Sequence, residues 1–562
     1  MIANNVKRLR NKIRREVHSR IDEVGRARGK KKSLRELRES NVRSDLMLLP
    51  SAGEQMLFRL TRSMNLSEIR EESRLCISRI LDEAGMIHWG FPSKSNAASN
   101  IHTLAGNGYQ LFAALRGSHE LSHWYFQFVR PDGKSVGGPR LVRELKWSKH
   151  FHTIRLFERV AYNTTSSFRS GASQGVLLSF WEESQLPVNV PTDALTSEAE
   201  EEEVVQEVII APLWNECCTL LPNPIHRESD FVRSLSEAEN PLATHVDFEI
   251  DAVYTWVDGA DELWQTQKAS ALNVLDEQQF VDDAVSDARF ADHDELRYSL
   301  RSIDQFAPWI RKIWIVTAGQ VPKWLDTSNP RVEIISHEDI WPDSTGLPNF
   351  NSHAIESNLH RINGLADHYL YFNDDFFLTR PLDPSAFFFG NGISKVFFSK
   401  AMVEFTEVSG ADNASSVAAK NARHLLLSRG YSSFSRKFFH TPSPLDKNVV
   451  KTAEIEFEDA FRETRAAQFR DSNDIAVSGS FYFNYALASG HAVPGQIKYD
   501  YIDPATTDGR DRMKRVIKRR DKDCIVINDG STPESTQERA KTDAFIRDSL
   551  ELLLPVKSKF EI

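Results

Sequence analysis

The stretch Tyr369-Leu-Tyr-Phe-Asn-Asp-Asp-Phe-Phe-Leu378 places an amide and two adjacent carboxylates between two apolar, aromatic runs. Its first four residues predict a buried strand, because they form a short, β-prone apolar run. Buried carboxylates need a cation, hydrogen-bond donors or water, and Asp374 and Asp375 would point to opposite faces of a regular strand. We therefore expect the strand to end at Asn373, where ligand sites gather in open α/β sheets. The alternative is an ordinary Asn-Asp-Asp turn without a site.

Further strands and helices alternate around this stretch. The β-prone runs are Ile250–Val257, Lys312–Thr317 and Val332–Ser336, and the helical patterns include Asp294–Ile303 and Ala354–Leu365. Alternation of this kind predicts an α/β domain over residues 246–562, with a mostly parallel sheet in a three-layer arrangement like that of nucleotide-sugar transferases. Asp258 and the pair Asp374 and Asp375 all follow strand ends, so one edge of the sheet is expected to bring them together.

The first half of the chain has a different character. Residues 46–190 mix helical patterns with β-prone runs such as His123–Val129 and Val176–Trp181, and they carry no catalytic motif. We expect an accessory α+β domain there. Residues 186–203 combine Pro187, Pro191 and the acidic run Glu198–Glu203, a composition typical of a linker, and we expect an acidic linker and connecting segment over residues 191–245.

A basic segment precedes both domains. Residues 1–45 hold 15 Lys and Arg against 6 Asp and Glu, a balance of +9 in a chain of net charge −10. The apolar stripe of an amphipathic helix is formed by Val6, Leu9, Ile13, Val17, Ile21 and Val24. Such a helix suits an anionic membrane surface or an acidic partner, and the alternative is a solvated helix packed on its own protein. Nucleic-acid binding is not expected, because no binding motif accompanies the charge.

The sequence also bears on cellular location. It has no apolar run long enough to span a membrane, and no apolar segment of a secretory signal follows the basic start. We expect a cytoplasmic protein, with peripheral contact at the inner face of the membrane through residues 1–45.

The candidate site residues carry a consistent chemistry. Carboxylates without neighbouring His or Cys ligands favour a hard cation, Mg²⁺ or Mn²⁺, which takes one or two protein carboxylates together with substrate phosphates. His440 precedes a proline-rich extended segment, where an imidazole suits a general base, although a lone His is more often structural. The guanidinium of Arg470 is a good partner for a phosphoryl oxygen, or else a surface group.

Taken in order, these motifs resemble the Stealth family of hexose-1-phosphate transferases, which includes bacterial exopolysaccharide phosphotransferases. The matching stretches are Asp251–Gly259, Glu295–Ser302, Leu347–Asn351, Ala354–Glu356, Leu359–Ile362, Tyr371–Asp375, His440-Thr-Pro442, Arg470–Tyr485 and Cys524–Asp529. The resemblance covers residues 249–530 and leaves 1–245 uncovered.

The resemblance implies transfer of a sugar 1-phosphate from a nucleotide diphosphate sugar to a glycan hydroxyl, with release of the nucleoside monophosphate. In that reaction Asp258, Asn373, Asp374 and Asp375 would hold the metal and the donor, with Asp374, Asp375 and Asp258 as metal ligands. His440 would deprotonate the acceptor, and Arg470 would neutralise the transferring phosphoryl group.

Two arginines of the segment after the first motif are further candidates. Arg297 and Arg301 fall where the family binds its donor, so the resemblance implies substrate contact by both. At helical spacing they also share a face with Asp294, which predicts an ion-pair network as the alternative.

Two other functions fit parts of the same pattern. The acids alone would allow a metal-dependent glycosyltransferase that releases the nucleoside diphosphate. A catalytically inactive scaffold that binds polysaccharide or membrane through its N-terminal half is the other alternative.

Overall fold

The computed structural model describes residues 45–51, 54–90, 99–130, 132–147, 152–164, 168–191, 201–212, 220–222, 245–273, 293–409, 412–432, 435–528 and 536–562. The basic segment 1–44, with its predicted amphipathic helix, lies outside these ranges. The chain divides into two compact units, Met1–Leu242 (unit 1) and Ala243–Ile562 (unit 2), and the division falls within residues 191–245.

The described residues of unit 1 form two sheets and two helices. One sheet has the order β1-β2-β8, and the other runs β11-β10-β9-β7-β5-β6, with β4 joined to β9 and to β3. The strands are β1 Leu46–Ser51, β2 Glu54–Leu60, β3 His88–Trp89, β4 Ser99–Leu104, β5 Tyr125–Val129, β6 Ser135–Leu141, β7 Thr153–Phe157, β8 Val160–Ala161, β9 Val176–Pro191, β10 Glu201–Ile210 and β11 Leu220–Pro222. The helices are α3 Leu66–Glu83 and α4 Gly108–Gly117.

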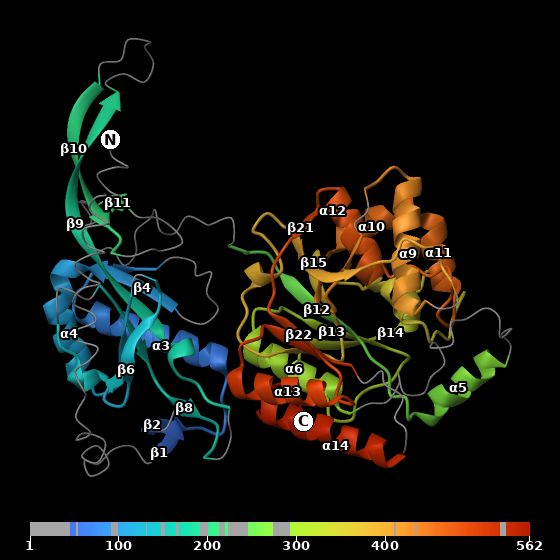
Figure 1. The fold of residues 1–562 in the computed structure, drawn as a ribbon, viewed down its shortest axis with the longest axis horizontal. Helices are drawn as coiled ribbons and strands as arrows, with labels where there is room; N and C mark the ends of the chain where they lie inside the picture. The colour runs from blue at the N-terminus through green and yellow to red at the C-terminus, as the bar shows by residue number, and fades with distance from the viewer. Residues whose placement is uncertain are drawn as a thin grey trace. The chain divides into compact units, whose positions relative to one another are not determined.

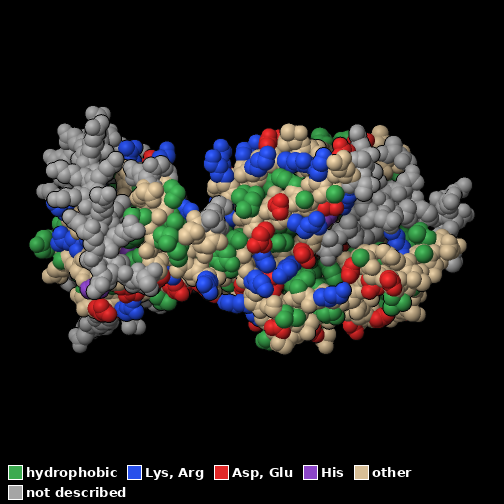
Figure 2. All heavy atoms as spheres, turned by 90° about the horizontal axis from the view of Figure 1, so that it is seen from below, with side chains coloured by type: hydrophobic (Ala, Val, Ile, Leu, Met, Phe, Trp, Pro, Cys, Tyr) green, Lys and Arg blue, Asp and Glu red, His purple; other side chains and the backbone are tan. Residues whose placement is uncertain are grey.

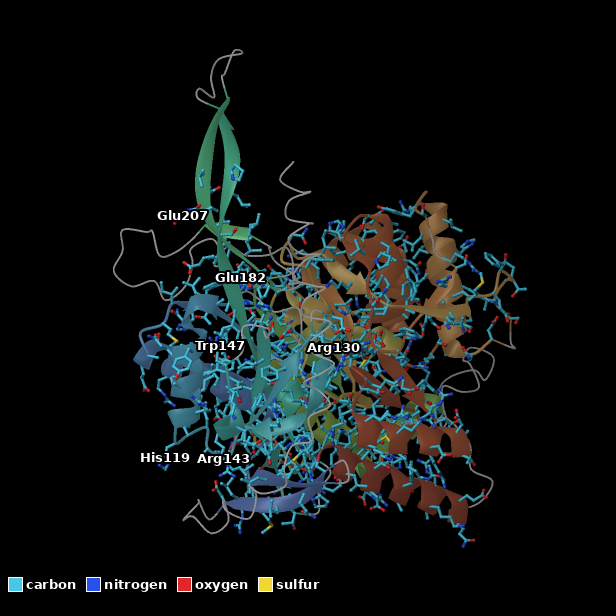
Figure 3. The ribbon with its side chains drawn as sticks, turned by 60° about the vertical axis from the view of Figure 1, so that its left-hand side comes forward. His119, Arg130, Arg143, Trp147, Glu182 and Glu207 are labelled. Carbon is cyan, nitrogen blue, oxygen red and sulfur yellow. The ribbon has the colours of Figure 1, made fainter. Side chains whose placement is uncertain are left out.

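The predicted linker is in part a β-ribbon. Strand β9 continues to Pro191. Its residues Glu182–Pro191 pair antiparallel with all of β10. Figure 3 shows Glu182 of β9 and Glu207 of β10 along this ribbon. The composition was misleading because proline is tolerated on a strand with an open edge. The expectation of a linker over the whole of 191–245 is therefore wrong for Glu201–Ile210.

Unit 2 contains the predicted α/β sheet. Its strands are β12 Ile250–Thr255, β13 Ile313–Thr317, β14 Val332–Ser336, β15 His368–Asn373 and β20 Ser443–Asp446. They lie in the order β14-β13-β12-β15-β20, and all neighbours are parallel except the antiparallel pair β15 and β20. This confirms the α/β class with a mostly parallel sheet.

Helices cover both faces of this sheet. Figure 1 shows α9, α10, α11 and α12 on one side and α6, α13 and α14 on the other. Their bounds are α6 Glu295–Phe306, α9 Ala414–Ser428, α10 Lys447–Glu456, α11 Glu458–Ala466, α12 Tyr482–Ala488, α13 Thr507–Arg519 and α14 Thr536–Leu553. Successive side chains of a strand point to opposite faces of the sheet. Val253 and Tyr371 accordingly join the core under α10 to α12, whereas the hydroxyl of Tyr254 forms a hydrogen bond with Ser299 of α6 on the other face.

Shorter elements complete unit 2. A second sheet has the order β16-β23-β22, and two strand pairs, β17 with β21 and β18 with β19, lie outside it. The strands are β16 Phe376–Leu378, β17 Ser394–Val396, β18 Phe398–Met402, β19 Arg436–Phe438, β21 Ala492–Pro494, β22 Tyr499–Ile502 and β23 Cys524–Ile527, and the helices are α5 Glu262–Leu272, α7 His337–Ile340 and α8 Ser352–Glu356.

One predicted helix is shorter than expected. The pattern over Ala354–Leu365 becomes α8, which ends at Glu356, and a separate turn of 3₁₀-helix. Ser357 Oγ and Asn358 Nδ2 both donate to the Ala354 carbonyl, at 2.7 and 3.0 Å. Bonds of this kind compete with the helical ladder, so the helix stops where these two polar side chains follow it.

Candidate active site

The acid pair Asp374 and Asp375 lies at the carboxyl end of β15. The strand ends at Asn373, as predicted, and β16 begins at Phe376, so the two aspartates form the whole connection. Because β12 and β13 run parallel to β15, the residues that follow them emerge at the same edge of the sheet. The pair therefore occupies the position at which open α/β sheets bind ligands.

Asp375 lies in an unfavourable environment for a bare carboxylate. Its Oδ1 is buried and has no hydrogen-bond partner. Burial raises the pKa of Asp375 well above its usual value, and the negative charges of Asp374 and Glu295 raise it further. Glu295 is itself buried and begins α6. A cation at this point would relieve both the desolvation and the repulsion.

Asp258 follows the neighbouring strand β12. Its backbone N–H donates to Gln320 Oε1, and Gln320 Nε2 donates back to the Asp258 carbonyl, both at 3.0 Å. Gln320 follows β13, so this reciprocal pair joins the ends of β12 and β13. The Asp258 carboxylate accepts the Ala260 N–H at 2.9 Å and so also shapes its own turn. Its role as a metal ligand stays a prediction.

His440 reaches the same edge from the antiparallel strand. Since β20 pairs antiparallel with β15, with Tyr371 opposite Ser443, the residues before β20 lie beside the end of β15. His440 Nε2 is 3.4 Å from Asn373 Nδ2, and its ring stands edge-on to Phe376 with centroids 4.6 Å apart. The structure therefore brings together His440 and the segment that carries the acid pair.

The imidazole of His440 is held neutral. Loss of hydration from the protein atoms crowded around the ring lowers its pKa to about 4, and the positive charge of Arg470 contributes. The residue as a whole is nevertheless exposed, so the ring stays reachable from solvent. A neutral imidazole with a reachable edge can accept a proton from a bound hydroxyl group.

Arg470 lies between His440 and the helix α8. Its Nη2 donates to Ser352 Oγ at 2.8 Å, and Ser352 opens α8. Glu356 follows Ser352 by one helical turn and faces the same way. Burial raises the pKa of Glu356, while His353 and Arg470 oppose that shift through their charges. Arg470 thus faces an imidazole and a buried carboxyl group at once.

Glu356 also reaches the strand end through a tyrosine. Tyr371 donates its hydroxyl to Glu356 Oε1 at 3.3 Å and is 3.0 Å from Thr255 Oγ1 of β12. Sequence reasoning assigned no role to Glu356 or to Glu295. The available signal for Glu356 was a single acidic residue directly after the small residue Ala354 and the apolar residue Ile355.

The structure does not bring Arg297 and Arg301 to the acids. Both bind Glu561: Arg297 Nε donates to Oε2 at 2.6 Å, and Arg301 donates to both carboxylate oxygens at 2.8 and 3.0 Å. The opposite face of α6, with Ser299 and Ser302, bonds the backbone of β16. The expected donor contact has no support in these bonds, and the alternative of a structural ion-pair cluster describes the two residues.

The described residues hold neither a preformed metal cluster nor a membrane-spanning helix. Within these ranges, no group of three or more His, Cys, Asp and Glu side chains has the arrangement of a metal site. In the same part of the chain, no helix combines the length and apolar character that crossing a membrane requires.

Family models match three segments of unit 2. They are Stealth protein CR1, conserved region 1, at residues 248–275, CR2, conserved region 2, at 289–396, and CR3, conserved region 3, at 439–487. Together they contain the strand ends, the acid pair, His440 and Arg470.

Curated proteins extend this similarity. The exopolysaccharide phosphotransferase SCO6023 of Streptomyces coelicolor is 39% identical over 335 residues, which are 60% of this chain and 56% of that protein. The exopolysaccharide phosphotransferase CpsY of Mycobacterium tuberculosis (strain H37Rv) is 34% identical over 415 residues, which are 73% of each chain. This chain spans about half the length of the Streptomyces relatives that it matches.

Solved structures give a weaker likeness. The galactosyltransferase LgtC, solved with donor and acceptor sugar analogues, aligns at a TM-score of 0.29 and 12% identity, over 54% of this chain and 96% of that one. The bifunctional glycosyltransferase WbbM also gives 0.29 and 12%, over 55% of this chain and 50% of its own. At these scores the likeness adds nothing to the strand order described above.

Proposed function

Because the chain belongs to the Stealth family, we propose that it transfers a sugar 1-phosphate from a nucleotide diphosphate sugar to a glycan hydroxyl in polysaccharide synthesis. The donor is a UDP-hexose or a UDP-N-acetylhexosamine. The acceptor oxygen forms a bond to the β-phosphorus, the bond from that phosphorus to the bridging oxygen breaks, and the nucleoside monophosphate leaves. The observation that carries the proposal is the neutral His440 beside Asn373, next to the acid pair and facing Arg470.

Each part of the site has a task in this reaction. His440 takes the proton of the acceptor hydroxyl as its oxygen approaches phosphorus. Arg470 offsets the negative charge on the transferring phosphoryl group, and Asn373 supplies a neutral polar contact beside it. Glu356 positions Arg470 through their opposite charges, and its bonded neighbour Tyr371 ties that arrangement to the end of the sheet. Phosphoryl transfer depends mainly on such positioning and charge stabilisation.

The residues present fit a divalent cation, Mg²⁺ or Mn²⁺. The buried, unbonded Oδ1 of Asp375 and the adjacent Asp374 offer hard oxygen ligands, with Asp258 on the neighbouring strand end as a third candidate. Mg²⁺ typically takes one or two protein carboxylates and completes its shell with water and substrate phosphates. A bound ion would supply charge neutralisation for the donor diphosphate.

The identity of the released nucleotide tests the proposal. The protein is incubated with UDP-N-acetylglucosamine or UDP-glucose, Mg²⁺ and a bacterial polysaccharide, and the products are separated by anion-exchange chromatography. Release of UMP that EDTA abolishes and Mg²⁺ or Mn²⁺ restores is the expected result. Release of UDP would instead identify a glycosyltransferase that breaks the anomeric bond, the second function that the acid pair fits.

We also propose that the protein works in the cytoplasm at the inner face of the membrane, with residues 1–45 in contact with anionic lipid. The balance of +9 in this segment supports the proposal. On the face of unit 2 visible in Figure 2, basic and acidic side chains are interspersed.

A further inference from the structure

Aromatic side chains continue from His440 along one side of the site. The ring of Phe439, the residue before His440, lies 5.0 Å from the ring of Tyr499 between centroids. Tyr499 begins β22, and Tyr501 stands two residues farther along the same strand. We refer to Phe439, Tyr499 and Tyr501 as the aromatic strip.

Strand register places both tyrosines on the side of the sheet that faces His440. Phe376 of β16 is opposite Val526 of β23, and Val526 is opposite Tyr501 of β22. Paired residues of neighbouring strands point to the same face. Since the Phe376 ring touches His440, Tyr501 shares the face that carries this contact, and Tyr499 follows with the same alternation.

The other face of β22 is already occupied. Asp500 accepts a hydrogen bond from Arg512 of α13 at 3.3 Å and forms an ion pair with Lys522 at the same distance. Ile502 is fully buried. Tyr499 and Tyr501 therefore lie on the face of β22 opposite to Asp500 and Ile502. The Tyr501 side chain remains 44% exposed.

The charge of Asp375 also acts on both tyrosines. Burial raises the pKa of both Tyr499 and Tyr501, and the charge of Asp375 contributes to each shift. Tyr501 thus presents an exposed aromatic ring on β22, the edge strand of the sheet β16-β23-β22. The phosphoryl transfer assigned to His440, Arg470 and the acid pair gives Tyr501 no role.

We propose that the aromatic strip is a stacking platform for the acceptor sugar, with Tyr501 as its most exposed member. The inference rests on the proposed function, which needs a sugar hydroxyl beside His440. The negative face of an aromatic ring attracts the C–H bonds on the flat side of a pyranose, and the phenol hydroxyl remains available for a hydroxyl group. The acceptor is favoured over the donor because Phe439 directly precedes His440, and Tyr501 shares the sheet face of Phe376, whose ring contacts His440.

Direct binding tests the platform without turnover. Saturation-transfer difference NMR is recorded on the full-length protein with the methyl pyranosides of glucose, galactose, mannose and N-acetylglucosamine. At least one glycoside is expected to show transfer to its ring protons. Tyr501→Ala should weaken that signal about fivefold or more, since an aromatic stacking contact supplies on the order of 1 kcal/mol or more. Tyr501→Phe should retain it.

A matched control separates stacking from a general loss of surface aromatics. Phe405 is 71% exposed and lies outside the strip, so Phe405→Ala should leave the signal unchanged. Absence of transfer to every glycoside, or an unchanged signal in Tyr501→Ala, would overturn the platform. Tyr501→Ala should also leave the affinity for UDP-N-acetylglucosamine within twofold, and equal weakening of both ligands would assign the strip to the donor instead.

Failure of the platform and failure of the proposed function are distinguishable. If wild-type protein binds a glycoside through Tyr501 but releases UDP, the platform stands and the phosphotransfer is wrong. If it releases UMP while Tyr501→Ala binds and reacts with the acceptor normally, the platform is wrong and the phosphotransfer stands.

Discussion

The amide nitrogen of Asn373 lies 3.4 Å from Nε2 of His440, although Asn373 ends β15 and His440 lies in the connection before β20, far along the chain. The antiparallel pairing of β15 with β20 creates this proximity, because the start of one strand lies beside the end of the other. The same edge receives the ends of the parallel strands β12 and β13. A mixed sheet can thus supply an acid pair and an imidazole at one edge, which a purely parallel sheet would not do through the same connection.

Removal of His440 should abolish the acidic limb of the pH profile. Wild-type UMP release is expected to fall as the pH drops through about 4, because the base must be neutral to accept a proton. His440→Asn should lower kcat by ~10²-fold or more and give a flat profile over that range. The measurement is UMP release from pH 3.5 to 8. The control is His424→Asn, at an exposed position of α9. An unchanged limb in His440→Asn would assign it to another group.

Arg470 should set the position of that limb. Its charge helps to lower the His440 pKa, after burial, so Arg470→Gln should move the limb to higher pH. It should also reduce kcat by ~10²-fold, since a cation aimed at the phosphoryl group is lost. Arg470→Lys keeps the charge and is expected to leave the limb in place while recovering only part of kcat, because a lysine cannot reproduce the guanidinium geometry. The same shift in both variants would exclude the electrostatic explanation.

Replacement of Glu356 should stabilise the protein and slow the reaction. Burial raises the pKa of Glu356, so its charged form is disfavoured in the folded state and lowers stability as the pH rises above its ordinary value of 4.5. The melting temperature of Glu356→Gln relative to wild type should therefore increase between pH 4.5 and pH 8. UMP release should drop roughly tenfold through loss of the charge that orients Arg470. A melting difference that is independent of pH would contradict the raised pKa.

Asp375→Asn should separate catalysis from structure. UMP release is expected to fall by ~10²-fold or more, because one electrostatic contact to the reacting group or its cation is lost. Folding, followed by circular dichroism, should persist, since the buried carboxylate makes no hydrogen bond through Oδ1. Asp459→Asn, at an exposed helical position, is the control. Full activity of Asp375→Asn in polysaccharide synthesis would favour the inactive scaffold.

The segment 1–45 should govern binding to anionic vesicles. A truncated protein that begins at residue 46 is expected to stay in the supernatant with phosphatidylglycerol vesicles, whereas the full chain should sediment with them. Each basic residue near such a surface contributes about 1 kcal/mol, and the effect weakens with salt. Vesicles of phosphatidylcholine alone are the control. Complete sedimentation of the truncated protein would remove the segment from this role.

Local patterns predicted the strand ends well because they combine short β-prone runs with the polar residues that stop them. Strand β15 ends at Asn373 as expected, whereas β12 ends at Thr255, two residues before the predicted end at Val257. Residues whose role depends on distant partners were harder to interpret. Glu356 acquires its meaning only from Tyr371 and Arg470, which come from other elements.

For the arginines of α6, the sequence indicated the wrong principal partner. The spacing of Arg297 and Arg301 indicated an ion pair with Asp294, yet the strong partner is Glu561, far along the chain. Sequence spacing reports neighbours within one helix, and it cannot report which remote carboxylate packs against it. The family resemblance suggested donor contact for the same residues. Such a resemblance indicates which segment lies near the donor, but it does not show which side chains of that segment touch it.

The pairing of β18 with β19 adds a second constraint on the position of His440. Tyr371 stands opposite Ser443 after this residue, and Phe398 stands opposite Phe438 before it. The Phe439 N–H also donates to the Phe397 carbonyl at 2.8 Å. His440 is thus held between two paired segments, so a substitution that loosens either pair is expected to displace the imidazole from Asn373.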